Sequence, residues 1–306
     1  MRHFLSLNDL TADDIRSILD NAHARKSARG DKPKGTVDDD APLAGHTLAM
    51  IFEKSSTRTR FSFEQGMRQL GGSAIVATSD TMQLGRGEPV KDTARVLSRY
   101  VDAIMMRVKS HETLTEFSRH ATVPIINGLS DYNHPCQILA DLMTLEERGL
   151  TLKGARIAWV GDGNNVAMSF VNLAAQTGID LVVASPNGYR LQGQEVERAR
   201  AAGAKITLTD DPDAAAAGAD ALITDCFVSM GDDDYDARLE MLSPYNLDEA
   251  RVAKAKPGAV VLHCLPAYRG QEITDAVMES AQSAIWDEAE NRLHAQKAVL
   301  MWCLER

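Results

Sequence analysis

The sequence predicts an α/β protein of two doubly wound domains, each a mostly parallel sheet with helices on both faces. Its 306 residues, at roughly 150 residues per domain, indicate two domains. Along the whole chain, apolar runs of strand length alternate with segments of helical period, which is typical of parallel strands joined by crossover helices. With 44% hydrophobic and 25% charged residues, the composition is that of an ordinary globular protein and excludes disordered, collagen-like and disulfide-scaffold classes.

In the first half of the chain, apolar runs and helical spacing alternate four times. The predicted strands are 48–52, 74–77, 103–107 and 123–126. The predicted helices are 59–70, 93–100, 114–120 and 137–147. The polar stretch 30–40 is expected to be a surface loop.

The second half repeats the alternation. Its predicted strands are 156–160, 181–184, 205–208, 221–224, 260–263 and 284–286. Segment 148–154 carries glycines near both ends and lies between a helical pattern and a new strand, so the domains are expected to be 1–148 and 149–290. Residues 291–306 are expected to form a helix that packs back on the first domain, and the acidic run 232–234 a solvated loop.

Charge and cysteine usage restrict the class of protein further. The net charge of −10 argues against general affinity for nucleic acid or an anionic membrane. Cys136, Cys226, Cys264 and Cys303 are too widely spaced for a zinc signature or a disulfide framework, which favours a reducing compartment. No signal-peptide core and no apolar run of about 20 residues is found, so a cytoplasmic location is expected.

Polar residues directly after a predicted strand are the first candidates for a site, because ligands of open parallel sheets bind beyond the carboxyl ends of the strands. Segment 55–60, Ser-Ser-Thr-Arg-Thr-Arg, lies where a strand turns into an amphipathic helix. Backbone N–H groups, hydroxyls and the fork of Arg58 would bind a phosphate there. The alternative is a helix capped by Ser56 or Thr57 with its arginines in water. The nucleoside triphosphate motif G-x-x-x-x-G-K-[ST] is missing.

Two further positions in the first half carry candidate chemistry. Arg107 closes an apolar strand, where a charge either reaches solvent or points into the ligand crevice. His134 precedes Pro135, which suits a helix start, and places Gln137 beside it in the first turn. One of these two side chains can donate to a developing oxyanion while the other contacts an amide. A capping or core histidine is the alternative, and no second ligand stands at metal spacing.

In the second half, 161–165 follows a strand, but it lacks the third glycine and the distant acid of a dinucleotide site. Asn164 or Asn165 could instead cap the helix or bind a polar substrate. Asp225 ends a strand, so its carboxylate can meet a cationic group, the alternative being an exposed loop carboxylate. Cys264 ends another strand, where a buried inert thiol is the usual outcome.

Together these motifs resemble the aspartate/ornithine carbamoyltransferase superfamily, and within it the ornithine branch. The resemblance covers the whole chain. It is carried by four motifs in order: Ser56-Thr57-Arg58-Thr59-Arg60, His134-Pro135-Cys136-Gln137, Asp225 with Ser229-Met230-Gly231, and His263-Cys264-Leu265-Pro266. Phe227 and Tyr268 depart from residues common in the family, tryptophan and histidine, without removing a mapped contact.

The resemblance implies transfer of the carbamoyl group from carbamoyl phosphate to the δ-amine of L-ornithine, giving citrulline and phosphate without metal or organic cofactor. It implies a catalytic set and a substrate-binding set. The catalytic set is Arg58, Arg107, His134, Gln137, Asp225 and Cys264. The substrate-binding set is Ser56, Thr57, Thr59, Gln83, Asn165, Ser229, Met230, Leu265 and Arg292.

The resemblance also implies a homotrimer or an assembly of trimers, with the loop around Gln83 reaching a neighbouring subunit. The chain length favours a role in arginine biosynthesis over catabolism. Alternatives are a carbamoyltransferase for another amine, a non-catalytic relative that binds a metabolite, and a nicotinamide-dependent dehydrogenase. Asp225 discriminates among acceptors, since ornithine has a cationic α-amine, aspartate would need extra positive charge, and N-acetylornithine presents a neutral amide.

Overall fold

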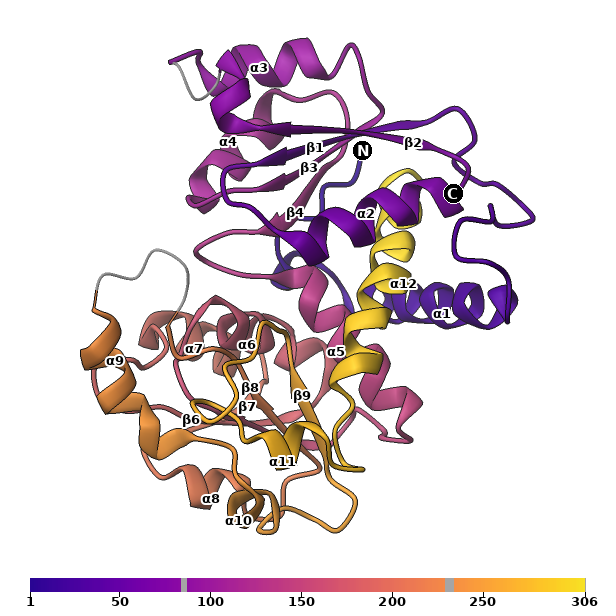
Figure 1. Cartoon of the computed structure of the whole chain (residues 1–306). Coiled ribbons are helices and arrows are strands. Elements are labelled where there is room, and N and C mark those ends of the chain that lie inside the picture. The colour runs from indigo at the N-terminus through magenta and orange to yellow at the C-terminus, as the bar shows by residue number, and fades with distance from the viewer. Residues whose placement is uncertain (84–86, 229–233, 306) are drawn as a thin grey trace. The chain divides into compact units, whose positions relative to one another are not determined.

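The computed structural model describes residues 1–83, 87–228 and 234–305 and divides the chain into two compact units. Unit 1 consists of Met1–Ala140 together with Arg292–Arg306, and unit 2 of Asp141–Asn291. Figure 1 shows a sheet and covering helices in each unit. In the described part of the chain, no helix combines the length and the apolar composition that crossing a membrane requires.

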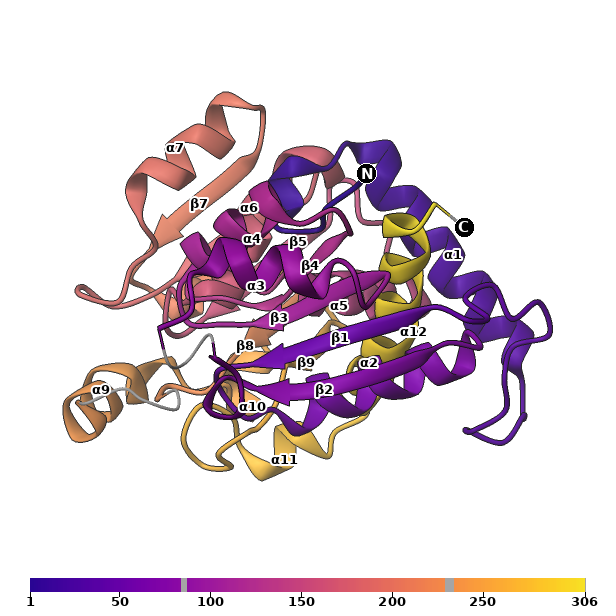
Figure 2. The ribbon, with the colours of Figure 1, turned by 90° about the horizontal axis from the view of Figure 1, so that it is seen from above.

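The sheet of unit 1 has four strands in the order β2-β1-β3-β4. They are β1 (Thr47–Phe52), β2 (Ser73–Thr78), β3 (Ala103–Arg107) and β4 (Ile125–Leu129). Every pairing is parallel, and Figure 2 shows the strands side by side. The chain leaves β1 toward one edge and returns to β3 on the other side of β1. The order of connection therefore reverses between β1 and β3, where a parallel sheet opens a crevice for ligands.

Helices cover both faces of this sheet (Figure 1). They are α1 (Ala12–Arg29), α2 (Thr57–Gln69), α3 (Val90–Leu97), α4 (His111–His120), the first turns of α5 (Pro135–Glu147) and most of α12 (Ile285–Cys303). Side chains of β1 alternate between the faces, and Ala49 and Ile51 share a buried cluster with Ala94 of α3 and Phe117 of α4. On α2, Gly66 permits close packing, because a Cβ there would lie 3.3 Å from Lys297 of α12.

The sheet of unit 2 has five parallel strands in the order β7-β6-β5-β8-β9. They are β5 (Arg156–Val160), β6 (Asp180–Ala184), β7 (Lys205–Thr209), β8 (Ala221–Thr224) and β9 (Val260–His263). The connection order reverses between β5 and β8, so the crevice of this sheet is expected beyond the carboxyl ends of those two strands.

The helices of unit 2 also form two layers (Figure 1). They are α6 (Asn165–Thr177), α7 (Gly193–Ala201), α8 (Pro212–Ala216), α9 (Tyr235–Leu242), α10 (Glu249–Val252) and α11 (Asp275–Met278). On one face, Val160 and Leu222 belong to a buried cluster that includes Ala215 of α8. On the other, Trp159 of β5 meets Phe170 of α6 with ring centroids 6.3 Å apart.

The sequence prediction of an α/β fold with two parallel sheets is confirmed. The predicted strand 284–286 is wrong, because helix α12 begins at Ile285 and only Ser283 makes a single bridge to Val261. An apolar run of three residues does not distinguish a strand from the first turn of a buried helix. The predicted strand 123–126 is displaced, since β4 covers Ile125–Leu129.

The polar stretch 30–40 is a loop, but not all of it faces solvent. Asp38 is buried and binds Arg29 at 2.6 Å and Lys297 at 2.7 Å. Burial alone would raise the pKa of Asp38, but Lys297 and Arg29 bring it below the ordinary value. This ion cluster fixes the loop to helix α12 within unit 1.

Candidate active site

In unit 1, candidate residues gather where the connection order of the sheet reverses. Loop 53–56 follows β1 and leads into α2, and Arg107 is the last residue of the neighbouring β3. The two strand ends are tied together, since the backbone N–H of Glu53 donates to the carbonyl of Arg107 at 2.9 Å. A carboxylate oxygen of Glu53 also accepts from the backbone N–H of Lys109 at 2.7 Å. The geometry therefore brings the predicted anion cradle beside Arg107.

Ser56 is the N-cap of α2, as the capping alternative in the sequence analysis proposed. Its hydroxyl accepts from the backbone N–H of Thr59 at 3.3 Å. Thr57 and Arg58 occupy the first turn, whose N–H groups have no partner within the helix. The cap and the anion cradle are compatible, because one N–H is taken by the serine and the helix start still presents partial positive charge.

Arginine side chains converge on the buried hydroxyl of Thr59. Arg107 donates to this oxygen at 3.4 Å and Arg292 of α12 at 3.0 Å. Arg292 lies 233 residues further along the chain than Thr59, yet both belong to unit 1. The structure thus brings together residues from β3, α2 and the last helix.

Helix α5 contributes the remaining members of this group. It begins at Pro135, as the sequence predicts, with His134 directly before it and Gln137 in its first turn. The guanidinium of Arg292 donates to the side-chain oxygen of Gln137 and lies 3.3 Å from Nε2 of His134. Because a guanidinium only donates, Nε2 is the acceptor and the proton of the neutral imidazole sits on Nδ1.

The environment keeps His134 neutral. Burial, followed by the charges of Arg292, Arg107 and Arg58, holds the pKa of His134 well below its ordinary value. An imidazole in this state polarises a carbonyl by hydrogen bonding and does not add charge. The cluster therefore combines cationic groups for an anion with a neutral donor for a carbonyl oxygen.

The loop predicted to reach a neighbouring subunit is only partly described. Gln83 is exposed, and its carbonyl accepts from the backbone N–H of Glu88 at 3.1 Å. Residues 84–86 lie outside the described part of the chain. The role assigned to Gln83 therefore stays a prediction.

In unit 2, the loop from β5 to α6 carries two glycines that sequence analysis weighed as a dinucleotide signal. Gly163 has a packing reason instead, because a Cβ there would lie 2.6 Å from the backbone nitrogen of Leu191. Asn164 follows and caps α6, its Oδ1 accepting from the N–H groups of Val166 and Ala167 at 2.9 and 3.2 Å. Asn165, the residue indicated by the resemblance, is the half-buried first residue of α6.

Asp225 follows β8 and lies beside this loop, because β5 and β8 are neighbours in the sheet. Its Oδ1 accepts from the backbone N–H of Cys226 at 2.7 Å and from the thiol of Cys264 at 3.0 Å. Its Oδ2 accepts from the amide of Asn164 at 2.8 Å. In the described ranges no cationic side chain forms an ion pair with Asp225, so this carboxylate is surrounded by neutral donors.

Cys264 follows the neighbouring strand β9. Burial, and then the charge of Asp225, raise the pKa of the Cys264 thiol well above its ordinary value. The sulfur therefore stays protonated at neutral pH and acts as a hydrogen-bond donor. Leu265 continues the turn, and its backbone N–H donates to Nδ1 of His263 at 2.9 Å.

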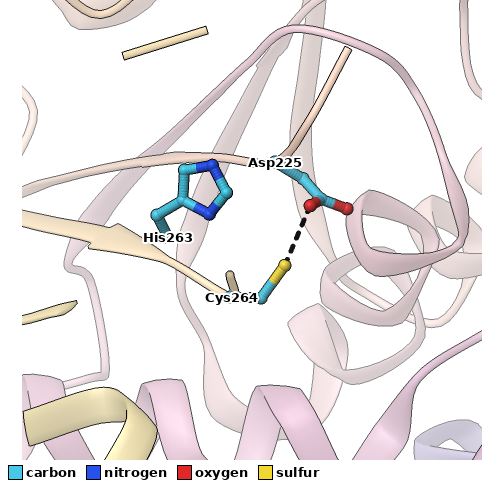
Figure 3. A group of neighbouring side chains, drawn as sticks. All are labelled: Asp225, His263 and Cys264. Carbon is cyan, nitrogen blue, oxygen red and sulfur yellow. Dashed lines mark hydrogen bonds between the residues drawn. The ribbon is translucent and has the colours of Figure 1, made fainter. Parts of the chain in front are cut away.

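Figure 3 shows Asp225, His263 and Cys264 grouped together, and their potential ligand atoms lie within 4.8 Å of one another. His263 is nevertheless committed on both ring nitrogens, since Nε2 lies 3.1 Å from a carboxylate oxygen of Glu272. A metal ion bound here would break one of these contacts or use only the aspartate and the cysteine.

Ser229 and Met230, which the resemblance assigns to the same half of the site, lie outside the described residues. Sequence analysis missed Glu272 and Glu288, the latter accepting from the backbone N–H of His263 at 2.8 Å. Both glutamates are buried. They belong to no motif, and no sequence pattern distinguishes them from surface acids.

Comparisons with known proteins also find two parts in this chain. Residues 2–147 match the family model "Aspartate/ornithine carbamoyltransferase, carbamoyl-P binding domain", and residues 153–303 match "Aspartate/ornithine carbamoyltransferase, Asp/Orn binding domain". The chain is 54% identical over 305 residues to the ornithine carbamoyltransferase of Rhizorhabdus wittichii, covering 100% of this chain and 99% of the relative. It is 53% identical over 302 residues to that of Caulobacter vibrioides, covering 99% and 97%.

Solved structures give the same result. The ornithine carbamoyltransferase of Pyrococcus furiosus is similar with a TM-score of 0.93 and 46% identity, covering 99% of this chain and 97% of that one. The anabolic ornithine carbamoyltransferase of Campylobacter jejuni is similar with a TM-score of 0.91 and 41% identity, covering 100% and 99%.

Proposed function

The chain belongs to the aspartate/ornithine carbamoyltransferase family, and from this membership we propose that it transfers the carbamoyl group of carbamoyl phosphate to the δ-amine of L-ornithine. The products are L-citrulline and phosphate. The observation that carries the choice of acceptor is Asp225, a largely buried carboxylate held by three neutral donors. Such a carboxylate suits the cationic α-amine of ornithine and would repel the carboxylates of aspartate.

The cluster of unit 1 fits the donor substrate. The start of α2 and the guanidinium groups of Arg58 and Arg107 supply positive charge for the phosphate of carbamoyl phosphate. Neutral His134, with Gln137 beside it, supplies hydrogen bonds for the carbamoyl carbonyl and amino groups. These assignments follow from the basic character of the cluster and the low pKa of His134.

The reaction forms a C–N bond and breaks the bond between the carbamoyl carbon and the phosphate oxygen. The δ-amine attacks through its lone pair, and the electrons of the breaking bond leave with phosphate. Thr59, Arg107 and His134 stabilise the charge that develops on the carbonyl oxygen of the tetrahedral intermediate. The proton of the amine passes to the departing phosphate or to solvent.

Only the neutral amine attacks. An alkylamine with a pKa of about 10.4, like that of lysine, costs roughly 4 to 5 kcal/mol to deprotonate at pH 7. Desolvation and the positive charges of Arg58 and Arg107 near the bound donor lower the pKa of the amine and reduce this cost.

The test offers the purified protein carbamoyl phosphate with L-ornithine and, in parallel, N-acetylornithine, putrescine and aspartate. Colorimetric detection of citrulline reports the first reaction, and phosphate release reports all of them. We expect ornithine to give the highest kcat/KM. A higher value for another amine would reassign the acceptor, and no phosphate release with any amine would indicate a non-catalytic metabolite-binding relative.

We further propose that the enzyme works toward citrulline in arginine biosynthesis, as a cytoplasmic homotrimer or assembly of trimers. A similar solved enzyme, that of Campylobacter jejuni, is described as anabolic, and four free cysteines suit a reducing compartment. Growth of an arginine-requiring host that lacks its own enzyme, restored by this chain, tests the direction. Light scattering tests the assembly, for which we expect the mass of three chains or a multiple of it.

A further inference from the structure

Asn164 holds two elements of unit 2 at once, and neither the family match nor the resemblance assigns it a role. Its Oδ1 accepts from two backbone N–H groups in the first turn of α6, and its Nδ2 donates to Oδ2 of Asp225 at 2.8 Å. A single side chain thus joins the end of β5, the start of α6 and the carboxylate after β8.

The orientation of this amide follows from the chemistry of its neighbours. If the amide were turned over, its NH₂ group would face the N–H groups of Val166 and Ala167, and its oxygen would face a carboxylate oxygen. Both contacts would be repulsive. Nδ2 therefore has to point at Asp225 for as long as Asn164 caps the helix.

The acceptor positions of the Asp225 carboxylate show what the hydrogen bond from Asn164 does. An ionised carboxylate offers about four acceptor positions. Cys226 and Cys264 occupy two on Oδ1 of Asp225, and Asn164 occupies one on Oδ2. Among the contacts that the described residues make, one position on Oδ2 stays open. Without the amide of Asn164, Oδ2 would have two open acceptor positions, and the orientation of the Asp225 carboxylate would depend on solvent.

We propose that Asn164 is a positioning residue for the acceptor substrate, holding the open lone pair of Asp225 in the direction that the α-ammonium of ornithine requires. The inference rests on the proposed function. Asn164 itself does not touch the reacting atoms and acts only through Asp225. Its effect is therefore confined to the acceptor substrate and to acceptors that carry an α-ammonium group.

Two variants separate positioning from helix capping, because both keep a side chain that caps well. N164S keeps a capping hydroxyl and loses the NH₂ group that donates to Asp225. N164D keeps the cap and nearly the same shape, but places a second carboxylate against Asp225. If only the stability of the helix mattered, N164D would be milder than N164S, because an anion is favourable at a helix N-terminus. If Asn164 instead positions Asp225, N164D should be more severe than N164S.

We expect N164S to raise the KM for ornithine about tenfold, which corresponds to ~1.4 kcal/mol. N164D should raise it by at least about another factor of ten, because like charges in contact repel. The KM for carbamoyl phosphate should stay within about twofold in both variants. The matched control is D211S, since Asp211 caps α8 through two backbone N–H groups in the same unit and makes no contact with Asp225. It should leave both KM values unchanged.

A mutant cycle with D225N completes the test. If Asn164 acts through Asp225, N164S should have little further effect on kcat/KM for ornithine in the D225N background. Equal effects of N164S in both backgrounds, or an N164D enzyme closer to wild type than N164S, would overturn the inference while leaving the proposed function intact. A wild-type protein that forms no citrulline would overturn both.

Discussion

Replacing Asp225 with asparagine removes one charge from unit 2 with almost no change in volume. The carboxylate now accepts from Cys226 and Cys264 on Oδ1 and from Asn164 on Oδ2. In D225N one of the two oxygens becomes an NH₂ group. In either orientation that group faces an existing N–H donor, at Cys226 or at Asn164, so one contact becomes repulsive.

The expected loss has two parts. A hydrogen bond between a charged group and its partner contributes about 1.5–3 kcal/mol, and a buried donor left without an acceptor costs about 1–3 kcal/mol. Together they give roughly 2.5 to 6 kcal/mol, and since 1.4 kcal/mol is a factor of ten, kcat/KM for ornithine should fall by about two to four orders of magnitude. The KM for carbamoyl phosphate should change by less than about twofold, because the phosphate site is built from unit 1.

The assay measures citrulline formation with each substrate varied in turn. The matched control is D220N, which makes the same change at the other end of β8, where Asp220 binds Lys256 at 2.7 Å and the backbone N–H of Arg156 at 2.8 Å. That control should retain both KM values. Two results would show that Asp225 does not bind the acceptor substrate. One is a loss of kcat/KM for carbamoyl phosphate as large as that for ornithine in D225N. The other is a loss of less than threefold in kcat/KM for ornithine.

Three further predictions concern unit 1. R292K should raise the KM for carbamoyl phosphate about tenfold or more and leave the KM for ornithine unchanged, because an ammonium cannot reproduce the fork of the Arg292 guanidinium. Initial rates with each substrate varied in turn measure both values. Equal increases in the two KM values would contradict the prediction. Burial, followed by the charge of Lys297, lowers the pKa of His294 to about 3. Below pH 6.5 this imidazole therefore binds a proton in the unfolded chain but not in the folded chain. The free energy of unfolding of the wild type should therefore fall as the pH drops from 6.5 to 3, by up to about 1.4 kcal/mol per pH unit. Urea unfolding at pH 7.5 and 5 should show a smaller fall for H294Q. The same fall in both proteins would refute the lowered pKa of His294. D38N should cost about 3–5 kcal/mol of unfolding free energy by leaving the buried Lys297 ammonium without its carboxylate, whereas D39N, at an exposed pair, should cost under about 1 kcal/mol.

Sequence pattern was sufficient to place the candidate residues that directly follow a strand. The motif around Ser56 and the pair His134 and Gln137 lie where the alternation of strands and helices predicts, because parallel strands present their carboxyl ends at one edge of the sheet. The sequence already lacked the rest of a dinucleotide motif around the glycines before Asn164, and packing against Leu191 gives the physical reason for one of them. Local spacing thus found the positions but not always the reason for them.

The contacts that sequence reasoning could not supply are those made between distant segments. Glu272 and Glu288 look like surface acids in the sequence, but both are buried beside His263, Glu272 from the segment after β9 and Glu288 from helix α12. The strand predicted at 284–286 was wrong for a related reason, since two of its three apolar residues, Ile285 and Trp286, begin helix α12. Burial of a side chain depends on what packs over it, and that information is spread along the whole chain.

Arg292 has a consequence for how the protein is made. The other side chains of its cluster come from the first 137 residues, whereas the arginine follows Gln137 by 155 residues, after the whole of unit 2. A ribosome therefore translates all of unit 2 before this cluster of unit 1 receives its last guanidinium. A nascent chain that has not yet reached Arg292 therefore carries this cluster without that guanidinium.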